Sequence, residues 1–284
     1  MAIKYPEILE LTENNCRVEY SDQDTILYAL GIGLGSDPLS SRELPFVYEQ
    51  NLQAVPTFGT TIAGRVGVNT ERLGVNYKFV LHGEEETILH RPMPPAAKLI
   101  ADSGVEAVYD KGAEKGALVV RRTVLRDEQD GGEIATLKRT IFARADGGCG
   151  GSDQPPPKPH SIPDRSPDEK LSYSIRKDQA ALYRLSGDRN PLHIDPARAT
   201  AAGLPAPILH GLCTYGMACR AVLEAYCDFD AELIASHAAR FSAPVFPGEL
   251  IEIEMWRDNN VVSFQVNVPA RGVAVIKNGR TCLR

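Results

Sequence analysis

The sequence predicts an α+β protein built from two similar halves, each an antiparallel sheet wrapped around a long central helix. Three observations lead to this prediction. In the second half, a short helix, a loop and a long apolar helix are followed by four β-rich segments. The first half repeats this order more loosely, and a segment rich in glycine and proline separates the halves. A helix that is apolar on nearly every face is a buried one.

The length and composition fit one or two globular domains. The chain has 284 residues, of which 43% are hydrophobic and 24% charged, as is usual for soluble domains. Residues 146–168 are crowded with glycine, proline and polar residues and show no periodicity, which is typical of a linker. We therefore expect a first unit over residues 1–145, a linker over 146–168 and a second unit over 169–284.

Charge and cysteine usage exclude several classes of protein. The net charge of −6 argues against a general nucleic-acid binder. No apolar run approaches the roughly 18 residues of a membrane span, and the first residues lack the pattern of a secretory signal. The six cysteines form no CxxC pair and fit reduced thiols. We expect a cytoplasmic protein. A peroxisomal location would require a eukaryotic host, and Cys282-Leu283-Arg284 does not match the Ser-Lys-Leu type of peroxisomal targeting signal.

The first half begins with a predicted helix over residues 21–30, with Ser21 or Asp22 as its cap. A Gly-x-Gly-x-Gly run follows at 31–35. Nucleotide-binding glycine loops follow a strand, whereas this run follows a helix, so we disfavour that function. A loop that replaces a lost functional segment is the better interpretation.

The remainder of the first half is β-rich. Residues 74–91 are predicted to contain two strands, and His82 falls in a strand pattern that does not favour a catalytic base. Residues 117–126 and 134–143 are two further predicted strands. Asp130-Gly131-Gly132 is the expected hairpin turn between them.

The second half starts with a predicted strand over residues 171–175 and a helix over 176–186. Gly187 is a suitable helix stop. Asp195 is a suitable cap for a second short helix over 196–202, which begins with a proline.

A long buried helix is predicted over residues 208–227, which are apolar on nearly every face. Strands are expected over 240–245 and 250–256, and the second of these alternates glutamate with apolar residues. Asn259-Asn260 is the expected turn into two final strands.

The residues that could take part in catalysis lie just before the long helix. Asp188, Asn190 and His193 lie at tight spacing on a loop that Pro191 stiffens. The spacing lets an acid and a base point to one side and share a water molecule. Gly211 lies in the first turn of the long helix, where backbone N–H groups lack intrahelical partners and the helix dipole is positive. This end can donate to a developing oxyanion.

The run over residues 183–195, Tyr-Arg-Leu-Ser-Gly-Asp-Arg-Asn-Pro-Leu-His-Ile-Asp, resembles the hydratase 2 signature of the MaoC-like dehydratases. The run over 209–216, Leu-His-Gly-Leu-Cys-Thr-Tyr-Gly, resembles the start of the central helix of that family. The resemblance implies a double hot-dog fold, in which the first half is a degenerate repeat. Residues 22–31 echo 178–186 but continue without the aspartate and the histidine.

The resemblance also implies a reaction. Asp188 and His193 would activate water, Asn190 would support them, and Gly211 would form the oxyanion hole for addition of water to trans-2-enoyl-CoA, giving (3R)-3-hydroxyacyl-CoA. The substrate would be an acyl-CoA thioester with a medium, long or bulky chain, as in fatty-acid or lipid side-chain oxidation. No cofactor and no metal are expected. The fold pairs two hot-dog units, which one chain can supply by itself, and we expect a homodimer of chains.

Other interpretations of the same residues are weaker. His193 with Asp195 lacks a third residue spaced to complete a metal site. Cys213 falls in the helix core and is a poor candidate for a nucleophile. His210 is expected to be a packing or hydrogen-bonding residue at the helix start. Two alternative functions stay open: dehydration of a carrier-protein-bound or small-acid hydroxyacyl thioester, and noncatalytic binding of acyl thioesters.

Overall fold

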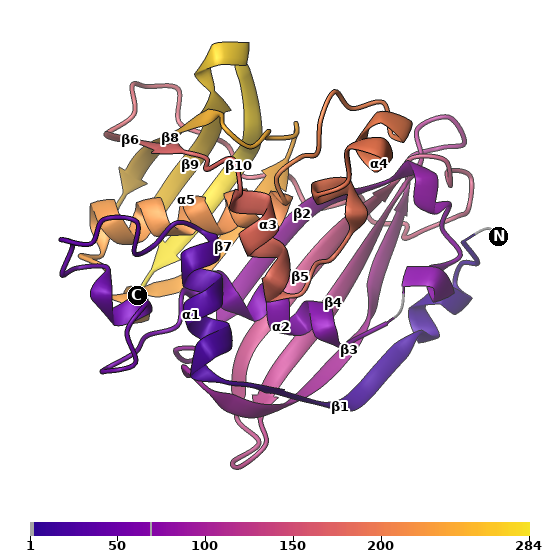
Figure 1. The fold of residues 1–284 in the computed structure, drawn as a ribbon. Coiled ribbons are helices and arrows are strands. Elements are labelled where there is room, and N and C mark those ends of the chain that lie inside the picture. Colours follow the sequence, from indigo (N-terminus) through magenta and orange to yellow (C-terminus); the bar gives the residue numbers. More distant parts are fainter. Residues whose placement is uncertain (1–2, 69) are drawn as a thin grey trace.

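The computed structural model describes residues 3–68 and 70–284. Its ten strands form one antiparallel sheet in the order β1-β3-β4-β5-β2-β7-β10-β9-β8-β6 (Figure 1). The first half supplies β1 (Thr12–Tyr20), β2 (Val80–Leu89), β3 (Ala97–Asp110), β4 (Ala117–Asp127) and β5 (Glu133–Ala143). The second half supplies β6 (Glu169–Ser174), β7 (Ile234–Phe241), β8 (Leu250–Asp258), β9 (Val261–Val268) and β10 (Val273–Leu283).

The two predicted sheets join edge to edge where β2 pairs with β7. This pairing satisfies backbone groups that two separate sheets would leave exposed at their edges. Ion pairs cross the junction, because Glu84 lies 3.7 Å from Arg240 and Glu86 lies 3.2 Å from Arg280. The α+β class with two sheet units is confirmed, and the two sheets are continuous rather than separate.

The long buried helix of the second half is confirmed as α5 (Gly211–Tyr226). Every residue from Cys213 to Leu223 is buried. Figure 1 shows α5 lying along the concave side of β7 to β10. A helix apolar all round is stable in this position, because the curved sheet covers it on several sides.

The expectation of a long central helix in the first half is wrong. Its counterpart α2 (Gly59–Arg65) has only seven residues, and Val66 ends it in extended geometry. Two glycines and two threonines among seven residues give a weak helix former. Gly67 follows with a φ of +107°, which the backbone of a glycine adopts without strain. Beyond α2 a segment with two short 3-10 turns, η4 (Thr70–Leu73) and η5 (Tyr77–Phe79), covers the sheet face in place of a continued helix, and Val68, Leu73 and Val75 pack on the strands.

The three short helices are confirmed. Helix α1 (Asp22–Gly31) begins with a capping box between Ser21 and Asp24. Helix α3 (Gln179–Tyr183) continues as one 3-10 turn to Ser186, and α4 (Pro196–Ala201) follows. Helices α1 and α3 pack together, and Gln179 donates its side-chain N–H to the carbonyl of Gly31 at 2.5 Å. The loop after α1 thus borders the second half.

Two strand predictions need correction. Residues 74–91 hold one strand, β2, rather than two. The glutamates at 84–86 stay within the strand because arginines of neighbouring strands pair with them. The strand expected over 240–245 is β7, which ends at Phe241. Pro244 and Pro247 lack the N–H that a longer strand would need, and the alanine-rich start of β7 has low β propensity.

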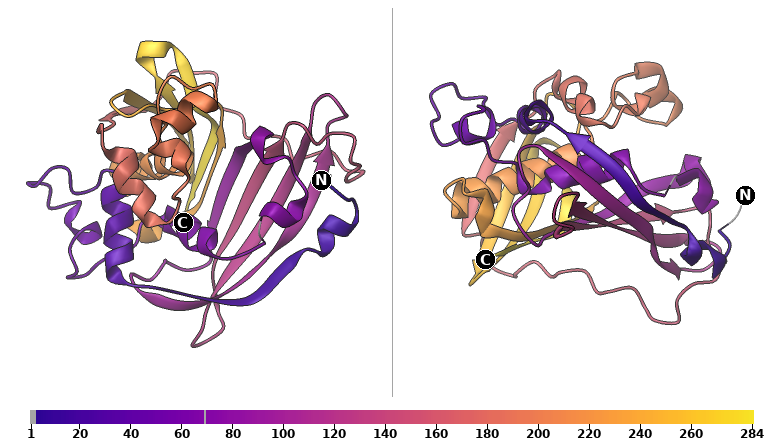
Figure 2. Two further views of the ribbon diagram at one scale, coloured as in Figure 1. Left: turned by 45° about the vertical axis from the view of Figure 1, so that its right-hand side comes forward. Right: turned by 90° about the horizontal axis from the view of Figure 1, so that it is seen from below.

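The segment between the halves runs without regular structure from residue 144 to 168. Figure 2 shows it crossing one side of the molecule to bring the chain from β5, inside the first unit, to β6 at the far sheet edge. His160 holds it in place through a 2.8 Å hydrogen bond with Ser263. Among the described residues, no helix is long and apolar enough to cross a membrane. All six cysteines are free.

Candidate active site

The loop between α3 and α4 carries the candidate residues past the start of α5. Gly187 ends the α3 segment with a φ of +138°, a conformation that favours glycine. The Asn190 side chain then accepts a hydrogen bond from the backbone N–H of Leu192 at 3.0 Å. Asp195 accepts one from Ala197 at 2.9 Å and starts α4. Local caps therefore fix the loop at both ends.

His193 and Asp188 face each other, as the motif predicts. The Nε2 atom of His193 lies 3.9 Å from the Oδ2 atom of Asp188. The Nδ1 atom lies 2.9 Å from the carbonyl oxygen of Ile208, so Nδ1–H donates there and Nε2 keeps its lone pair. Burial lowers the pKa of His193, which keeps the ring neutral near pH 7. The site thus presents an unprotonated nitrogen beside a carboxylate that is 51% exposed.

Asn190 contacts Asp188 through its backbone rather than its side chain. The Asn190 N–H donates to Asp188 Oδ1 at 3.0 Å, while its side chain caps the turn at 191–193. This bond orients the carboxylate and leaves its Oδ2 atom facing His193. A role for Asn190 as a positioning residue fits these contacts.

His210 belongs to the same cluster, and it both packs and forms a hydrogen bond at the helix start, as expected. Its ring stacks on His193 with a centroid distance of 3.7 Å, and its Nε2–H donates to the Asp188 carbonyl at 3.1 Å. Burial, and then His193, lower the pKa of His210 and keep it neutral. The only available signal was its position directly before Gly211.

Gly211 is the first residue of α5, with His210 as the N-cap. Its backbone N–H therefore has no carbonyl four residues earlier within the helix. The residue is exposed. A Cβ at this position would lie 3.3 Å from the ring of Phe241, so the absence of a side chain keeps the approach to the N–H open. The structure brings Gly211 next to His210 and hence to the Asp188–His193 pair.

A metal could in principle use this cluster, because one atom each from Asp188, His193 and His210 lies within 4.8 Å of the others. The two rings are stacked with an interplanar angle of 26°, however. Lone pairs lie in the ring plane, so those of stacked rings run side by side rather than converging on one ion. The structure favours acid–base chemistry without a metal at this cluster.

We predict that a metal chelator leaves the catalytic rate unchanged. Dialysis against EDTA followed by assay under matched ionic strength measures this. Inhibition that added zinc or manganese reverses would contradict the prediction and would make the three residues a metal centre.

The fold and the site define a protein of the MaoC-like dehydratase class. The family model described as MaoC like domain matches residues 159–278, and the one described as MFE-2 hydratase 2 N-terminal domain matches residues 18–145. The chain belongs to the hydratase 2 family of MaoC-like proteins.

Similar proteins cover nearly the whole chain. Enoyl-CoA hydratase ChsH3 of Mycobacterium tuberculosis is 40% identical over 92% of this chain and 93% of its own. The peroxisomal enoyl-CoA hydratase 2 of Arabidopsis thaliana is 37% identical over 92% and 89%. The crystal structure of a MaoC-like dehydratase from Phytophthora capsici superposes with a TM-score of 0.87 at 31% identity, covering 99% and 98%. These matches confirm the predicted family and the double hot-dog class.

Proposed function

We propose that the protein catalyses the (R)-specific, reversible hydration of trans-2-enoyl-CoA to (3R)-3-hydroxyacyl-CoA. The observation that supports this most is the arrangement of Asp188, His193 and the N-terminus of α5 around one point. A hydratase needs a base, an acid and an oxyanion donor at one place. Loss of the enoyl-thioester ultraviolet absorbance tests the reaction.

In the proposed mechanism, one water molecule lies between His193 Nε2 and Asp188 Oδ2. A separation of 3.9 Å leaves both atoms free to hydrogen-bond a shared water beside them. The water oxygen forms a bond to the β-carbon as Nε2 accepts its proton. Asp188 and His193 together then donate a proton to the α-carbon. The carbonyl of Ile208 holds the ring in the tautomer that can accept the proton.

The thioester oxygen gains negative charge as water adds to the β-carbon. We propose that the N–H of Gly211 stabilises this charge, with help from the positive end of the α5 dipole. The roles of Asp188, His193 and Gly211 follow the predicted ones, and Asn190 supports the pair through its backbone contact.

We predict that kcat/KM falls on the acid side with an apparent pKa below the ordinary histidine value of about 6.5. Burial lowers the pKa of His193, so the ring stays unprotonated to a lower pH than a solvent-exposed histidine. Protonation removes the lone pair that accepts the proton of water, and activity is lost as the pH falls through the lowered pKa. A pH profile of kcat/KM measures it, and an acid limb centred above the ordinary value would contradict the prediction.

The finer features of the protein are also proposals. We propose that residues 1–145 form a unit without catalytic residues that makes room for medium, long or bulky acyl chains. We place the catalytic unit at 169–284, after the linker at 146–168. A homodimer of chains and a cytoplasmic location are our expectations, and six free cysteines support a reducing compartment. Sedimentation equilibrium and fractionation of the host cell test these two points.

A further inference from the structure

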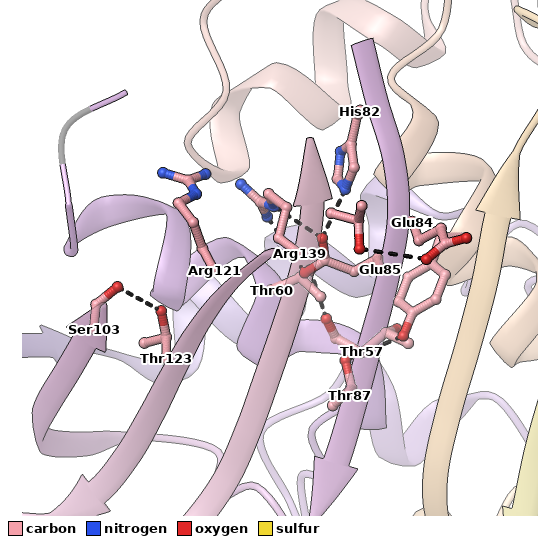
Figure 3. Close-up of polar contacts among 12 residues, drawn as sticks. Thr57, Thr60, His82, Glu84, Glu85, Thr87, Ser103, Arg121, Thr123 and Arg139 are labelled. Atoms are coloured by element: carbon pink, nitrogen blue, oxygen red, sulfur yellow. Dashed lines mark hydrogen bonds and ion pairs between the residues drawn. The ribbon is translucent and has the colours of Figure 1, made fainter. Parts of the chain in front are cut away.

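A buried ion pair between β2 and β5 holds a histidine of the first half in a fixed position. Glu85 on β2 is 2% exposed and accepts a hydrogen bond from Arg139 Nε at 2.8 Å. Arg139 Nη2 donates to the other carboxylate oxygen at 3.4 Å, so the guanidinium group occupies both oxygens. The Nε2 atom of His82 lies 2.8 Å from Glu85 Oε2, and Figure 3 shows these three side chains in contact. None of the three takes part in the proposed mechanism.

The protonation of the His82 ring follows from its partner. Burial by itself would raise the pKa of Glu85, but Arg139 and His82 lower it below the usual range, so the carboxylate is ionised. An ionised carboxylate only accepts hydrogen bonds, and Nε2 of His82 therefore carries the proton. Burial lowers the pKa of His82, which keeps the ring neutral near pH 7. Its Nδ1 atom thus keeps a lone pair and is a hydrogen-bond acceptor.

This acceptor is free. Among residues 3–68 and 70–284, no donor forms a hydrogen bond with Nδ1 of His82, and the atom is not enclosed. The His82 side chain is 28% exposed. Along β2, Leu81 is 51% exposed and Glu85 is 2% exposed. His82 therefore lies where the strand passes from the surface into the interior of the protein.

The free acceptor lies close to the proposed oxyanion donor. The ring of His82 packs edge-on against that of Phe241, the last residue of β7, with a centroid distance of 4.7 Å. A Cβ at Gly211 would lie 3.3 Å from the same Phe241 ring. Phe241 therefore contacts both residues, and one aromatic ring separates His82 from the N-terminus of α5.

The chemistry of a CoA thioester decides which part of it suits Nδ1. An acyl chain has no hydrogen-bond donor, so it would remove water from Nδ1 and offer nothing in return, which costs free energy. The CoA arm carries an amide N–H three bonds beyond the sulfur, roughly 6 Å from the thioester oxygen in an extended arm with ordinary bond lengths. That distance spans one aromatic ring. The CoA arm must also reach solvent, and His82 lies at the surface end of β2.

We propose that His82 binds the CoA arm of the substrate, and that its Nδ1 atom accepts a hydrogen bond from the amide N–H nearest the thioester sulfur. Glu85 and Arg139 are positioning residues, because they hold His82 in the tautomer whose Nδ1 is unprotonated. The half that lacks the catalytic pair thus contributes a substrate-binding residue to the active site. The proposal rests on the proposed hydratase function and adds a binding residue to it.

The first test compares trans-2-decenoyl-CoA with an analogue in which this amide is replaced by an ester, so that an oxygen stands in place of the N–H. We expect kcat/KM for the amide substrate to be higher by about fivefold, the size of one neutral hydrogen bond. Equal values for the two substrates would overturn the proposal.

The second test uses His82→Phe, which keeps a ring beside Phe241 and removes the acceptor. Glu85 keeps both hydrogen bonds from Arg139, so the buried carboxylate stays paired. We expect the ratio of the two kcat/KM values to fall by about fivefold, to near unity. Thermal melting verifies that the variant is folded.

His90→Phe is the matched control for this variant. His90 is an exposed histidine that directly follows β2, and its Nε2 atom lies 3.4 Å from Glu133. This substitution should leave the ratio of amide to ester substrate unchanged. An equal loss of activity on both substrates in His82→Phe, with the ratio unchanged, would indicate a purely structural role for His82 and would overturn the proposal.

Binding separates this proposal from the hydratase function. Calorimetry with decanoyl-CoA, which is saturated, and its ester analogue measures the same preference without turnover. Tighter binding of the amide ligand, lost in His82→Phe, would support the role of His82 even if hydration were absent. Normal hydration of trans-2-decenoyl-CoA without any preference between amide and ester would leave the hydratase function intact and overturn the role of His82.

Discussion

Replacing His193 with alanine lowers kcat on enoyl-CoA by a factor on the order of 10³, the range of general acid–base catalysis. The imidazole supplies the lone pair that takes the proton of water, whereas Nε2 of the neighbouring His210 is occupied by its hydrogen bond to the Asp188 carbonyl. Asp188→Asn should have an effect of similar size, because an amide cannot take part in the proton transfer to the α-carbon. Steady-state kinetics on one enoyl-CoA substrate measures both losses.

These substitutions should leave the fold intact. The His193 side chain makes one hydrogen bond, to a loop carbonyl, and Asp188 is half-exposed. His90→Ala and Asp178→Asn are matched controls, because both residues are exposed and lie outside the cluster. Thermal melting followed by circular dichroism verifies folding. Near-full activity in either His193→Ala or Asp188→Asn would contradict the assignment of Asp188 and His193 as the catalytic pair.

The second large effect is expected from Gly211→Pro, compared with Gly211→Ala. Proline removes the backbone N–H at the first helical position, where helices tolerate it. The preceding residue, His210, has φ −61° and ψ 132°, a geometry that proline permits. Loss of one oxyanion donor lowers kcat by about 10²–10³. We expect a loss of that order for the proline variant relative to the alanine variant.

The alanine variant is the control because it keeps the N–H and adds only the Cβ. That carbon would lie 3.3 Å from Phe241, so some loss is expected in both variants. The difference between them therefore isolates the hydrogen-bond donor. Equal kcat values for Gly211→Ala and Gly211→Pro, in two folded proteins, would remove Gly211 from the oxyanion hole.

Much of the second half could be predicted because its signals are local. Asp195 and Pro196 fix the start of α4, and Gly187 fixes the end of the α3 segment. The run at 208–227 is apolar on nearly every face, and this pattern predicts a buried helix. The tight spacing of Asp188 and His193 put them on one loop, where the structure also places them.

The parts that could not be predicted depend on contacts distant in sequence. Glu84 and Glu86 pair with arginines of β7 and β10, and nothing in the sequence around them indicates those partners. His210 stacks on His193 only because the loop that carries His193 lies against the start of α5.

The configuration at the 3-position of the product tests the central claim most directly. The protein would be given trans-2-enoyl-CoA, the loss of ultraviolet absorbance would be followed, and the hydroxyacyl product would be resolved on a chiral column. We predict rapid loss and a product of R configuration, with no product from the His193→Ala variant. An S product, or no hydration of any chain length by the folded protein, would contradict the account.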